Sequence, residues 1–341
     1  MPERIAVLST GANGSCIAAD LIRDGLDVTM IDQWPAHVEA IQANGLTIRT
    51  KAEEFNVAAH ALHLTDVCTL QHKFDRVVLT SKAYDSRWLT EFIKPYLAED
   101  GLLIAAQNAM TAEMIASIVG PQRTVGCVVE LASQMFDPGV VTRSTIREKT
   151  WFGVGAFDPV QANRVQDVVA VMSHAGRVEV CEDVLSAKWM KLTVNAMTMA
   201  LKALLGTTNE TMVNLPGIRE LFLNSGTEAL EAGQILGYQI VPIFGLKPED
   251  VESTNSLLET LLDKIIRDVG PTAINTVLQD HMKGRYSEVD LINGCIADTL
   301  KAKGRPAPVS DAIVDVSRRI YQGELRPSTE NLEIIRRQLA G

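Results

Sequence analysis

Residues 5–15 read Ile-Ala-Val-Leu-Ser-Thr-Gly-Ala-Asn-Gly-Ser, an apolar run that leads at once into a turn with two glycines. A helix-compatible run follows the turn, and a second apolar run, Val28–Ile31, ends in the carboxylate of Asp32. Strand, glycine turn, helix and strand in this order are typical of a dinucleotide-binding βαβ unit. In that unit the N-terminus of the helix faces the cofactor phosphates, because its free N–H groups attract anions.

The glycine turn matches the dinucleotide fingerprint G-x-G-x-x-G at its second and third glycines, which are Gly11 and Gly14. A glycine at the second position lets the backbone approach a pyrophosphate, and one at the third lets the helix pack closely on the strand. Ser9 stands where the first glycine is usual, so the turn must accommodate a Cβ atom there. We expect Gly11, Ala12, Asn13 and Gly14 to bind the cofactor; the alternative is an ordinary strand–turn–helix connection.

Asp32 lies about 20 residues beyond the glycine turn, where a carboxylate accepts both ribose hydroxyls of NAD. The additional phosphate of NADP would be repelled there, since two like charges about 4 Å apart at a protein surface cost roughly 1–4 kcal/mol. The residue therefore favours NAD over NADP. The alternative is that Asp32 caps the next helix, which Pro35 would open near its first turn.

The chain of 341 residues is longer than one compact core usually organises, so two domains are expected. Up to about Val178–Val180, short apolar runs alternate with amphipathic stretches, which predicts an α/β domain with a parallel sheet. From about Asp183 onward apolar residues recur at helical spacing, which predicts an all-α domain. We place a dinucleotide-binding domain at residues 1–182 and a helical substrate and catalytic domain at residues 183–341, with the active site expected in the cleft between them.

The individual elements are expected as follows. The strands of the first domain are expected at Ile5–Leu8, Val28–Ile31, Val77–Leu79, Leu102–Ala105, Val125–Glu130, Val140–Thr145 and Trp151–Val154. The helices of the second domain are expected at Val184–Leu204, Ile218–Ile235, Ser256–Ile266, Glu288–Lys303 and Asp311–Tyr321. The helix at Ile218–Ile235 has an apolar face, with Leu221, Ala229, Ala232 and Ile235, that suits either a core or a homodimer interface.

Charge and composition exclude several classes of partner. The formal net charge of −10 opposes binding to nucleic acid, because clustered Lys and Arg are needed to bind phosphate backbones. No apolar run approaches the roughly 20 residues that cross a bilayer, so we expect neither a membrane partner nor export. The five scattered cysteines include no C-x-x-C pair and suit small buried residues in a reducing cytoplasm. His60, His63 and His72 lack the spacing of a metal site, so we expect an exposed stretch there and no metal.

A polar pair interrupts the otherwise apolar start of the first helix of the second domain. Lys191 and Asn195 are four residues apart, so both project from one face of that helix. They must face water, a partner or a cleft, and a solvated stripe is the alternative to a functional pair. Lys82 and Asn108 follow two strands of the first domain, and the carboxyl ends of such strands are where ligands collect in open α/β sheets.

A second candidate segment begins at Ser287, which suits the N-cap of a helix. Glu288 would then occupy the first helical position, where the helix dipole favours the ionised carboxylate. Asp290, Asn293 and Gly294 complete this polar opening.

On these features the chain resembles the ketopantoate reductase (2-dehydropantoate 2-reductase) family over nearly its whole length. Besides the glycine turn, the residues that carry the resemblance are Lys82, Gln107, Asn108, Lys191, Asn195, Asn209, the stretch at residues 276–280, and the segments at residues 287–290 and 292–294. The resemblance implies a Rossmann-type first domain and a second domain like the C-terminal domain of 6-phosphogluconate dehydrogenase. It also implies reduction of a small branched 2-oxo acid, first of all ketopantoate to pantoate, with NADPH or NADH.

The resemblance implies roles for individual residues. Lys191 would be the catalytic lysine, and Glu288 the acidic partner near the reacting carbonyl and the cofactor. The residues that would hold the substrate are Asn108, Asn195, Asn209 and Thr276. The residues that would contact the cofactor beyond the glycine turn are Lys82, Asn108, Ala132 and Glu288.

The chain departs from the family pattern at four positions. Ser9 and Ala109 replace glycines, and Asp32 departs from the basic pattern that selects NADPH. Met199 stands where pantoate-binding members carry a second asparagine, which suggests an apolar substrate side chain in place of a hydroxymethyl group. An NAD-dependent dehydrogenase of another apolar or aromatic D-2-hydroxy acid, of the mandelate type, is therefore an alternative. A non-catalytic nucleotide-sensing protein is a further alternative, and the presence of both Lys191 and Glu288 argues against it.

Overall fold

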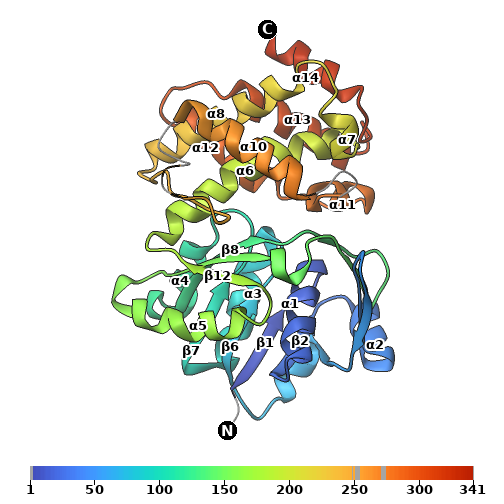
Figure 1. The fold of residues 1–341 in the computed structure, drawn as a ribbon, viewed down its shortest axis with the longest axis vertical. Coiled ribbons are helices and arrows are strands. Elements are labelled where there is room, and N and C mark those ends of the chain that lie inside the picture. Colours follow the sequence, from blue (N-terminus) through green and yellow to red (C-terminus); the bar gives the residue numbers. More distant parts are fainter. Residues whose placement is uncertain (1–2, 248, 250–253, 270–273, 341) are drawn as a thin grey trace. The chain divides into compact units, whose positions relative to one another are not determined.

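The computed structural model describes the chain except for residues 1–2, 248, 250–253, 270–273 and 341. The chain forms two compact units, Met1–Lys188 and Trp189–Gly341. All described strands belong to the first unit, and the described part of the second unit is helical (Figure 1). The expected succession of an α/β part and an all-α part is thus confirmed.

The first unit is built on an eight-stranded sheet in the order β12-β11-β8-β7-β6-β1-β2-β5. Neighbouring strands are parallel except β8 and β11, which are antiparallel. The strands are β1 (Arg4–Leu8), β2 (Asp27–Asp32), β5 (His60–His63), β6 (Phe74–Leu79), β7 (Leu97–Ala105), β8 (Thr124–Glu130), β11 (Trp151–Ala156) and β12 (Arg177–Val180). Of the three histidines expected in an exposed stretch, His60 and His63 lie in the edge strand β5, which pairs with β2, and His72 lies outside it. His60 is exposed, whereas His63 and His72 are half-buried.

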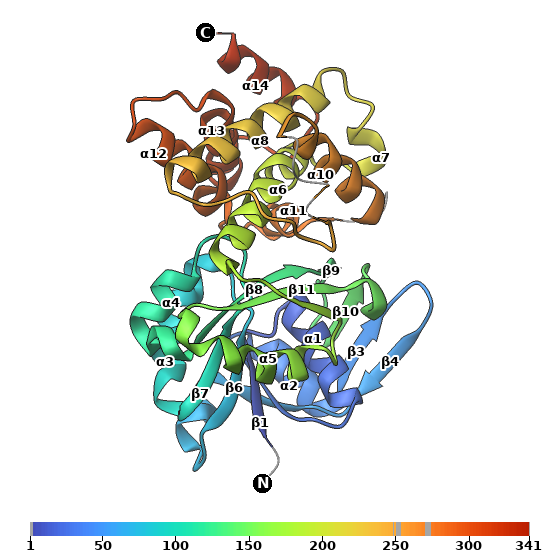
Figure 2. The same ribbon diagram turned by 60° about the vertical axis from the view of Figure 1, so that its left-hand side comes forward.

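Helices cover both faces of this sheet, because side chains of a strand point alternately to its two faces. On β1, Ile5 and Val7 belong to one hydrophobic core and Ala6 and Leu8 to the other. The first core includes α1 (Ala12–Arg23), α2 (Pro35–Asn44) and α5 (Val165–Met172), and the second includes α3 (Ser86–Ile93) and α4 (Ala112–Val119) (Figure 2). Short 3₁₀ helices are η1 (Leu64–Thr69), η2 (Ala83–Asp85), η3 (Lys94–Tyr96), η4 (Pro121–Arg123), η5 (Arg147–Lys149) and η6 (Pro159–Arg164).

A small sheet with the order β4-β3-β10-β9 packs against α1. Its strands are β3 (Leu46–Arg49), β4 (Glu54–Val57), β9 (Ser133–Gln134) and β10 (Val140–Arg143). Leu46, Ile48 and Val141 are buried in the same core as Cys16 of α1. Helix α1 therefore has apolar neighbours in both sheets.

The second unit consists of helices around one apolar core. Its helical elements are α6 (Val184–Leu205, which begins in the first unit), α7 (Asn209–Met212), α8 (Ile218–Ile235), α10 (Thr254–Val269), α11 (Thr276–Met282), the π-helical η7 (Asp290–Gly294), α12 (Cys295–Lys301), α13 (Pro308–Tyr321) and α14 (Asn331–Leu339). Leu221, Ala229 and Ala232 are buried within the unit, so their apolar face of α8 is core. No helix among the described residues is long and apolar enough to cross a membrane.

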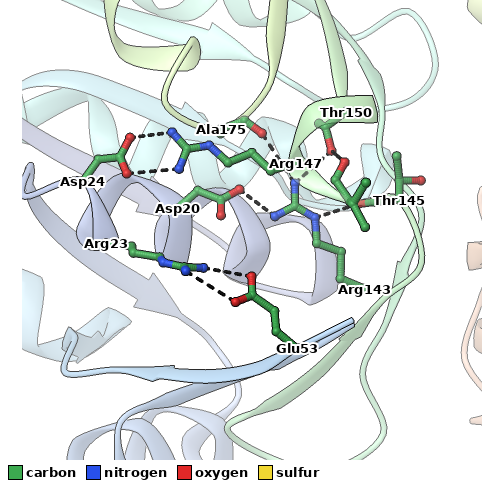
Figure 3. Close-up of polar contacts among 10 residues, drawn as sticks. Asp20, Arg23, Asp24, Glu53, Arg143, Thr145, Arg147, Thr150 and Ala175 are labelled. Carbon is green, nitrogen blue, oxygen red and sulfur yellow. Dashed lines mark hydrogen bonds and ion pairs between the residues drawn. The ribbon is translucent and has the colours of Figure 1, made fainter. Parts of the chain in front are cut away.

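A buried ion pair joins α1 to the small sheet (Figure 3). Arg143 Nη1 donates to Asp20 Oδ2 at 2.6 Å, and the two side chains are 2% and 3% exposed. The guanidinium also donates from Nε to the Thr145 carbonyl at 2.7 Å and from Nη2 to Thr150 Oγ1 at 2.8 Å. Burial raises the pKa of the Asp20 carboxyl, and the Arg143 charge opposes this rise. The pair therefore depends on its two members remaining together.

Replacement of Arg143 by methionine should lower the free energy of unfolding by about 3–5 kcal/mol, because the Asp20 carboxylate is left buried without its partner. Arg147→Met is the matched control. It removes the pair of Arg147 with Asp24, whose side chains are 33% and 27% exposed, and should cost about 1 kcal/mol or less. Urea unfolding monitored by circular dichroism measures both losses. Equal losses in the two variants would contradict the prediction.

Candidate functional site

The glycine turn begins with a residue in the left-handed backbone region. Ser9 has a φ of +64°, which is uncommon for a residue with a Cβ atom. Its N–H donates to the Ile31 carbonyl at 2.7 Å, and its own carbonyl accepts from Gly11 N at 2.8 Å and from Thr80 Oγ1 at 2.9 Å. Ser9 therefore adopts the backbone conformation that the fingerprint glycine usually adopts. Hydrogen bonds to residues at the ends of β2 and β6 hold it in place directly after β1.

Gly11 and Gly14 meet the two requirements that the fingerprint sets for them. A Cβ atom added to Gly11 would meet nothing within 4 Å, so the backbone of Gly11 lies open to a ligand. A Cβ atom added to Gly14 would lie 2.2 Å from Thr80 Oγ1 and 3.2 Å from the Ser9 carbonyl oxygen. Helix α1 follows Gly11 and has no acidic residue in its first turn. These residues fit the pyrophosphate of a dinucleotide, whose negative charge the helix N-terminus favours.

Asp32 lies at the end of β2 and is 5% exposed. Its Oδ1 accepts from the backbone N–H of Trp34 at 2.8 Å, and its Oδ2 accepts from Thr10 Oγ1 at 3.4 Å. Burial raises the pKa of the Asp32 carboxyl, and the Trp34 N–H opposes this rise. Because Trp34 is the N-cap residue of α2, the helix-capping interpretation of Asp32 also describes part of its role.

The buried His37 forms hydrogen bonds with the same glycine turn. Its Nδ1 accepts from the Gly139 N–H at 2.9 Å, so the proton of the neutral ring is assigned to Nε2, which donates to the Thr10 carbonyl at 3.0 Å. Burial lowers the pKa of His37, in agreement with a neutral ring. The ring thus links the glycine turn, α2 and the connection between β9 and β10.

The loop after β7 carries the second departure from a family glycine. Ala109 has a φ of +61° and is buried, so this position also keeps the backbone conformation that glycine adopts most readily. Gln107 Nε2 donates to the Leu79 carbonyl at 2.9 Å, and Thr111 Oγ1 donates to Gln107 Oε1 at 3.1 Å. Asn108 is half-buried and lies in the sequence between Gln107 and Thr111, which these hydrogen bonds hold in place. Lys82, the other expected strand-end residue, is half-buried and precedes η2.

Lys188 is a residue of this region that the sequence analysis missed. Its side chain is buried, and its Nζ donates to the carbonyls of Gln107 at 2.9 Å, Cys127 at 3.3 Å and Ala105 at 3.4 Å. Burial lowers the pKa of Lys188 to about 8, so the ammonium form still predominates at pH 7. The signal in the sequence was a lysine one helical turn before Lys191 on an apolar helix.

The segment around Ala132 is fixed to α1. The Ala132 N–H donates to Thr145 Oγ1 at 3.1 Å, and the Ala132 carbonyl accepts from the Ser144 N–H at 2.8 Å. Next to it, Ser133 Oγ donates to Asn13 Oδ1 at 2.5 Å. The structure therefore brings Ala132 close to the first turn of α1, where the fingerprint residues Ala12 and Asn13 lie.

In the second unit, α6 carries the expected polar pair. Asn195 is only 2% exposed and Lys191 is half-buried, so the pair is not a solvated stripe. The Nζ atom of Lys191 lies 4.9 Å from the centroid of the Phe244 ring. Phe244 belongs to the connection after α8, and nothing in its sequence context pointed to this contact.

Helix α11 begins against the same helix. Asn275 is its N-cap: Asn275 Oδ1 accepts from the Leu278 N–H at 2.9 Å, and Nδ2 donates to the Met199 carbonyl at 2.9 Å. The next residue, Thr276, has a buried hydroxyl oxygen with no hydrogen-bond partner in the part of the chain that the structure describes. An orphaned buried hydroxyl is costly, and a polar ligand would satisfy it.

Glu288 is 2% exposed and lies in a turn that leads into η7. The expected N-cap at Ser287 is wrong, because Ser287 Oγ lies 3.3 Å from Ser317 Oγ and the helix starts one residue after Glu288, at Val289. Its first turn is a π-helix, a form often found at functional sites. Asn293 Nδ2 donates to the Ala196 carbonyl at 3.4 Å, so this segment also packs on α6 next to Asn195.

The expected site residues thus gather in two groups. In the first unit the glycine turn, Asp32, Asn108 and Ala132 lie on or beside segments joined by the hydrogen bonds above. In the second unit α6 carries Lys191 and Asn195, and α11, η7 and the Phe244 loop pack on it. Asn209 opens α7, and its side chain lies outside the described part of the chain.

Lys188→Met should raise the KM for the nicotinamide cofactor about tenfold, because the Gln107 carbonyl loses its donor and the loop that holds Asn108 is released. The control is Lys202→Met, which replaces a second buried lysine of α6, one whose pKa burial also lowers to about 8. That variant should leave the cofactor KM unchanged. Steady-state kinetics with varied cofactor decides between them, and an unchanged KM in Lys188→Met would count against the role of Lys188.

Comparison with known proteins points to one family. The family model described as ketopantoate reductase PanE/ApbA matches residues 5–156, and the model of the C-terminal part of the same family matches residues 183–321. A 2-dehydropantoate 2-reductase from Mesorhizobium japonicum is 27% identical over 93% of this chain and 97% of its own length.

Two solved structures share the fold. A PanE/ApbA family ketopantoate reductase from Ralstonia eutropha has a TM-score of 0.78 at 24% identity, over 94% of this chain and 99% of its own. A D-mandelate dehydrogenase solved with NADH and anilino(oxo)acetate has a TM-score of 0.83 at 17% identity, with the same coverage of both chains. Since the family models match both halves of the sequence, this chain belongs to the ketopantoate reductase family.

Proposed function

We propose that this protein reduces a small branched 2-oxo acid to the D-2-hydroxy acid with a nicotinamide cofactor, and that the substrate is 2-dehydropantoate. The observation that carries the proposal is the half-buried Lys191 beside the buried Asn195 on one helix of a chain that belongs to this family. Cofactor binding is assigned to residues 1–182, and substrate binding and proton transfer to residues 183–341.

The residues of the glycine turn would hold the cofactor. The open backbone at Gly11 and the N-terminus of α1 suit the pyrophosphate, with Ala12, Asn13 and Gly14 beside it. Asp32 suits the ribose hydroxyls. The remaining contacts with the cofactor are assigned to Lys82, Asn108, Ala132 and Glu288. When bound, the reduced nicotinamide supplies the hydride.

The chain's own residues manage the substrate and the proton. Negative charge develops on the substrate oxygen as its carbonyl carbon is reduced, and the Lys191 ammonium donates first a hydrogen bond and then a proton to that oxygen. Glu288 orients the lysine and the new hydroxyl. Asn195, Asn209 and the orphaned Thr276 hydroxyl hold the oxo acid in a fixed orientation.

A second substrate class is favoured by one observation. Met199 presents an apolar side chain at the edge of the second unit's core, one turn beyond Asn195 on α6. A methionine there has no hydrogen bond to offer a hydroxymethyl group, whereas it suits a larger apolar or aromatic substituent. The second candidate is therefore a D-2-hydroxy acid dehydrogenase of the mandelate type.

Two further assignments belong to the proposal. We assign a homodimer on the basis of the family. One structurally similar ketopantoate reductase, from Staphylococcus aureus, is described as dimeric. A cytoplasmic location is supported by the five cysteines, all of which are free. The expectation that all five are buried is wrong: Cys16 and Cys127 are buried, Cys181 and Cys295 are half-buried, and Cys68 is exposed.

Lys191→Ala should lower kcat by about 10²–10⁴-fold with the best substrate, because the developing charge loses its proton donor. Lys191→Arg should keep the positive charge but also turn over poorly, since a guanidinium does not release a proton near neutral pH. Oxidation of NADH and NADPH at 340 nm, measured with 2-dehydropantoate and a panel of apolar and aromatic 2-oxo acids, is the assay. A preference for the apolar acids would select the mandelate-type candidate, and no turnover of any 2-oxo acid would refute the proposed function.

Asp32 should make NADH the preferred cofactor, since its carboxylate accepts ribose hydroxyls and repels a 2′-phosphate. Asp32→Asn keeps an oxygen that can accept the Trp34 N–H but removes the negative charge. We expect the ratio of kcat/KM for NADH to that for NADPH to fall by about tenfold or more in this variant. A wild-type protein that prefers NADPH, or an unchanged ratio, would show that Asp32 serves only the helix.

A further inference from the structure

Phe244 has a backbone conformation that its side chain does not favour. Its φ is +60°, and the next residue, Gly245, has a φ of +71°. The Leu246 N–H donates to the Ile243 carbonyl at 3.1 Å and closes a four-residue turn around these two residues. Turns with positive φ at both central positions are usually made by Asn, Asp or Gly, so a phenylalanine at the first central position needs a reason.

The Phe244 ring provides that reason through its contact with Lys191. The Nζ atom lies 4.9 Å from the ring centroid, within the roughly 6 Å over which a cation is attracted to the face of an aromatic ring. Phe244 is 2% exposed, so water does not compete on the ring. The contact both restrains the flexible lysine side chain and favours its protonated form.

The loop that carries Phe244 is attached to α6 at a second point. Tyr238 stacks on Trp189, with ring centroids 5.2 Å apart, and Trp189 Nε1 donates to the Ala229 carbonyl at 2.9 Å. Trp189 and Lys191 are both in the first part of α6. The loop is therefore held to α6 by aromatic contacts at two points, at Tyr238 before the turn and at Phe244 within it, so the ring position does not depend on the strained residue alone.

We propose that Phe244 is a positioning residue for the reaction: its ring holds the Lys191 ammonium in place and keeps it protonated until the substrate oxygen takes the proton. The inference rests on the proposed function, because it gives Lys191 the role of proton donor. After the transfer the neutral amine loses its attraction to the ring, so the ring also favours return of a proton from solvent. No other reactant is required.

The test compares variants that keep or remove the aromatic face. Phe244→Leu should lower kcat about tenfold and move the alkaline limb of the pH–kcat profile down by roughly 0.5–1.5 pH units, since the ammonium is no longer favoured. Phe244→Tyr keeps the ring and should leave the limb in place. The KM for the cofactor should be unchanged in both variants.

Tyr238→Leu is the matched control, because it removes the other aromatic contact of the same loop without touching Lys191. It should lower the melting temperature but leave the alkaline limb where it is. Other titratable groups on segments packed against α6 are unchanged in all these variants: Glu228, Asp280, His281, Glu288 and Asp290. A limb that moves with the ring therefore reports on Lys191.

If Phe244→Leu does not fold, pentafluorophenylalanine at position 244 keeps the shape of the ring while removing its negative face. It should move the limb in the same direction as leucine. A folded Leu or pentafluorophenylalanine variant with the wild-type limb and kcat would overturn the role of Phe244. Full activity of Lys191→Ala would instead overturn the role of Lys191 as proton donor, and no turnover of any 2-oxo acid by the wild type would overturn the proposed function, so these failures are distinguishable.

Discussion

The glycine turn, to which we assign cofactor binding, depends on the close approach of helix α1 to the strand ends at Gly14. Any Cβ atom there would lie 2.2 Å from Thr80 Oγ1, and this hydroxyl also donates to the Ser9 carbonyl at 2.9 Å. The helix can therefore begin directly beneath the strand ends, with Gly11 left open in front of it. Thr80 stands two residues before Lys82, so the contact that seats the helix also fixes the start of a second segment to which we assign cofactor binding. The lack of a side chain at Gly14 allows both the close approach of the helix and the hydrogen bond of Thr80 to Ser9.

Backbone strain in this chain lies next to the residues to which we assign function. Ser9, Ala109 and Phe244 are the non-glycine residues with positive φ in the described part of the chain. The left-handed conformation costs a residue with a Cβ atom roughly 1–2 kcal/mol. Such strain persists where the surrounding structure determines the conformation, and this occurs often at functional sites. Ser9 and Ala109 adopt a positive φ although each has a Cβ atom, so these two turns keep the conformation that glycine adopts most readily.

The sequence predicted those parts of the fold that depend on local periodicity. Helix α8 has the predicted bounds, Ile218–Ile235, because its apolar residues recur regularly. Strands β3 and β4 were missed because their four residues each are too short for a pattern, and they are defined by pairing with each other and with β10. A helix was predicted over Glu288–Lys303, but the π-helical form of η7, whose Asn293 contacts α6, was missed. The contact of Lys191 with Phe244 joins residues more than 50 positions apart, and no local pattern encodes it.

The three lysines of α6, Lys188, Lys191 and Lys202, differ in burial, and their spacing in the sequence does not reveal this difference. Lys188 and Lys202 are 3% and 4% exposed, and the Lys188 ammonium already donates to three backbone carbonyls. An ammonium held in this way stabilises the structure around it, but it has no proton direction left for a substrate. Lys191 is half-buried and rests against an aromatic face, which attracts a cation without accepting its proton. A proton donor must be held in place by a group that does not take its proton, and the Phe244 ring meets this condition for Lys191.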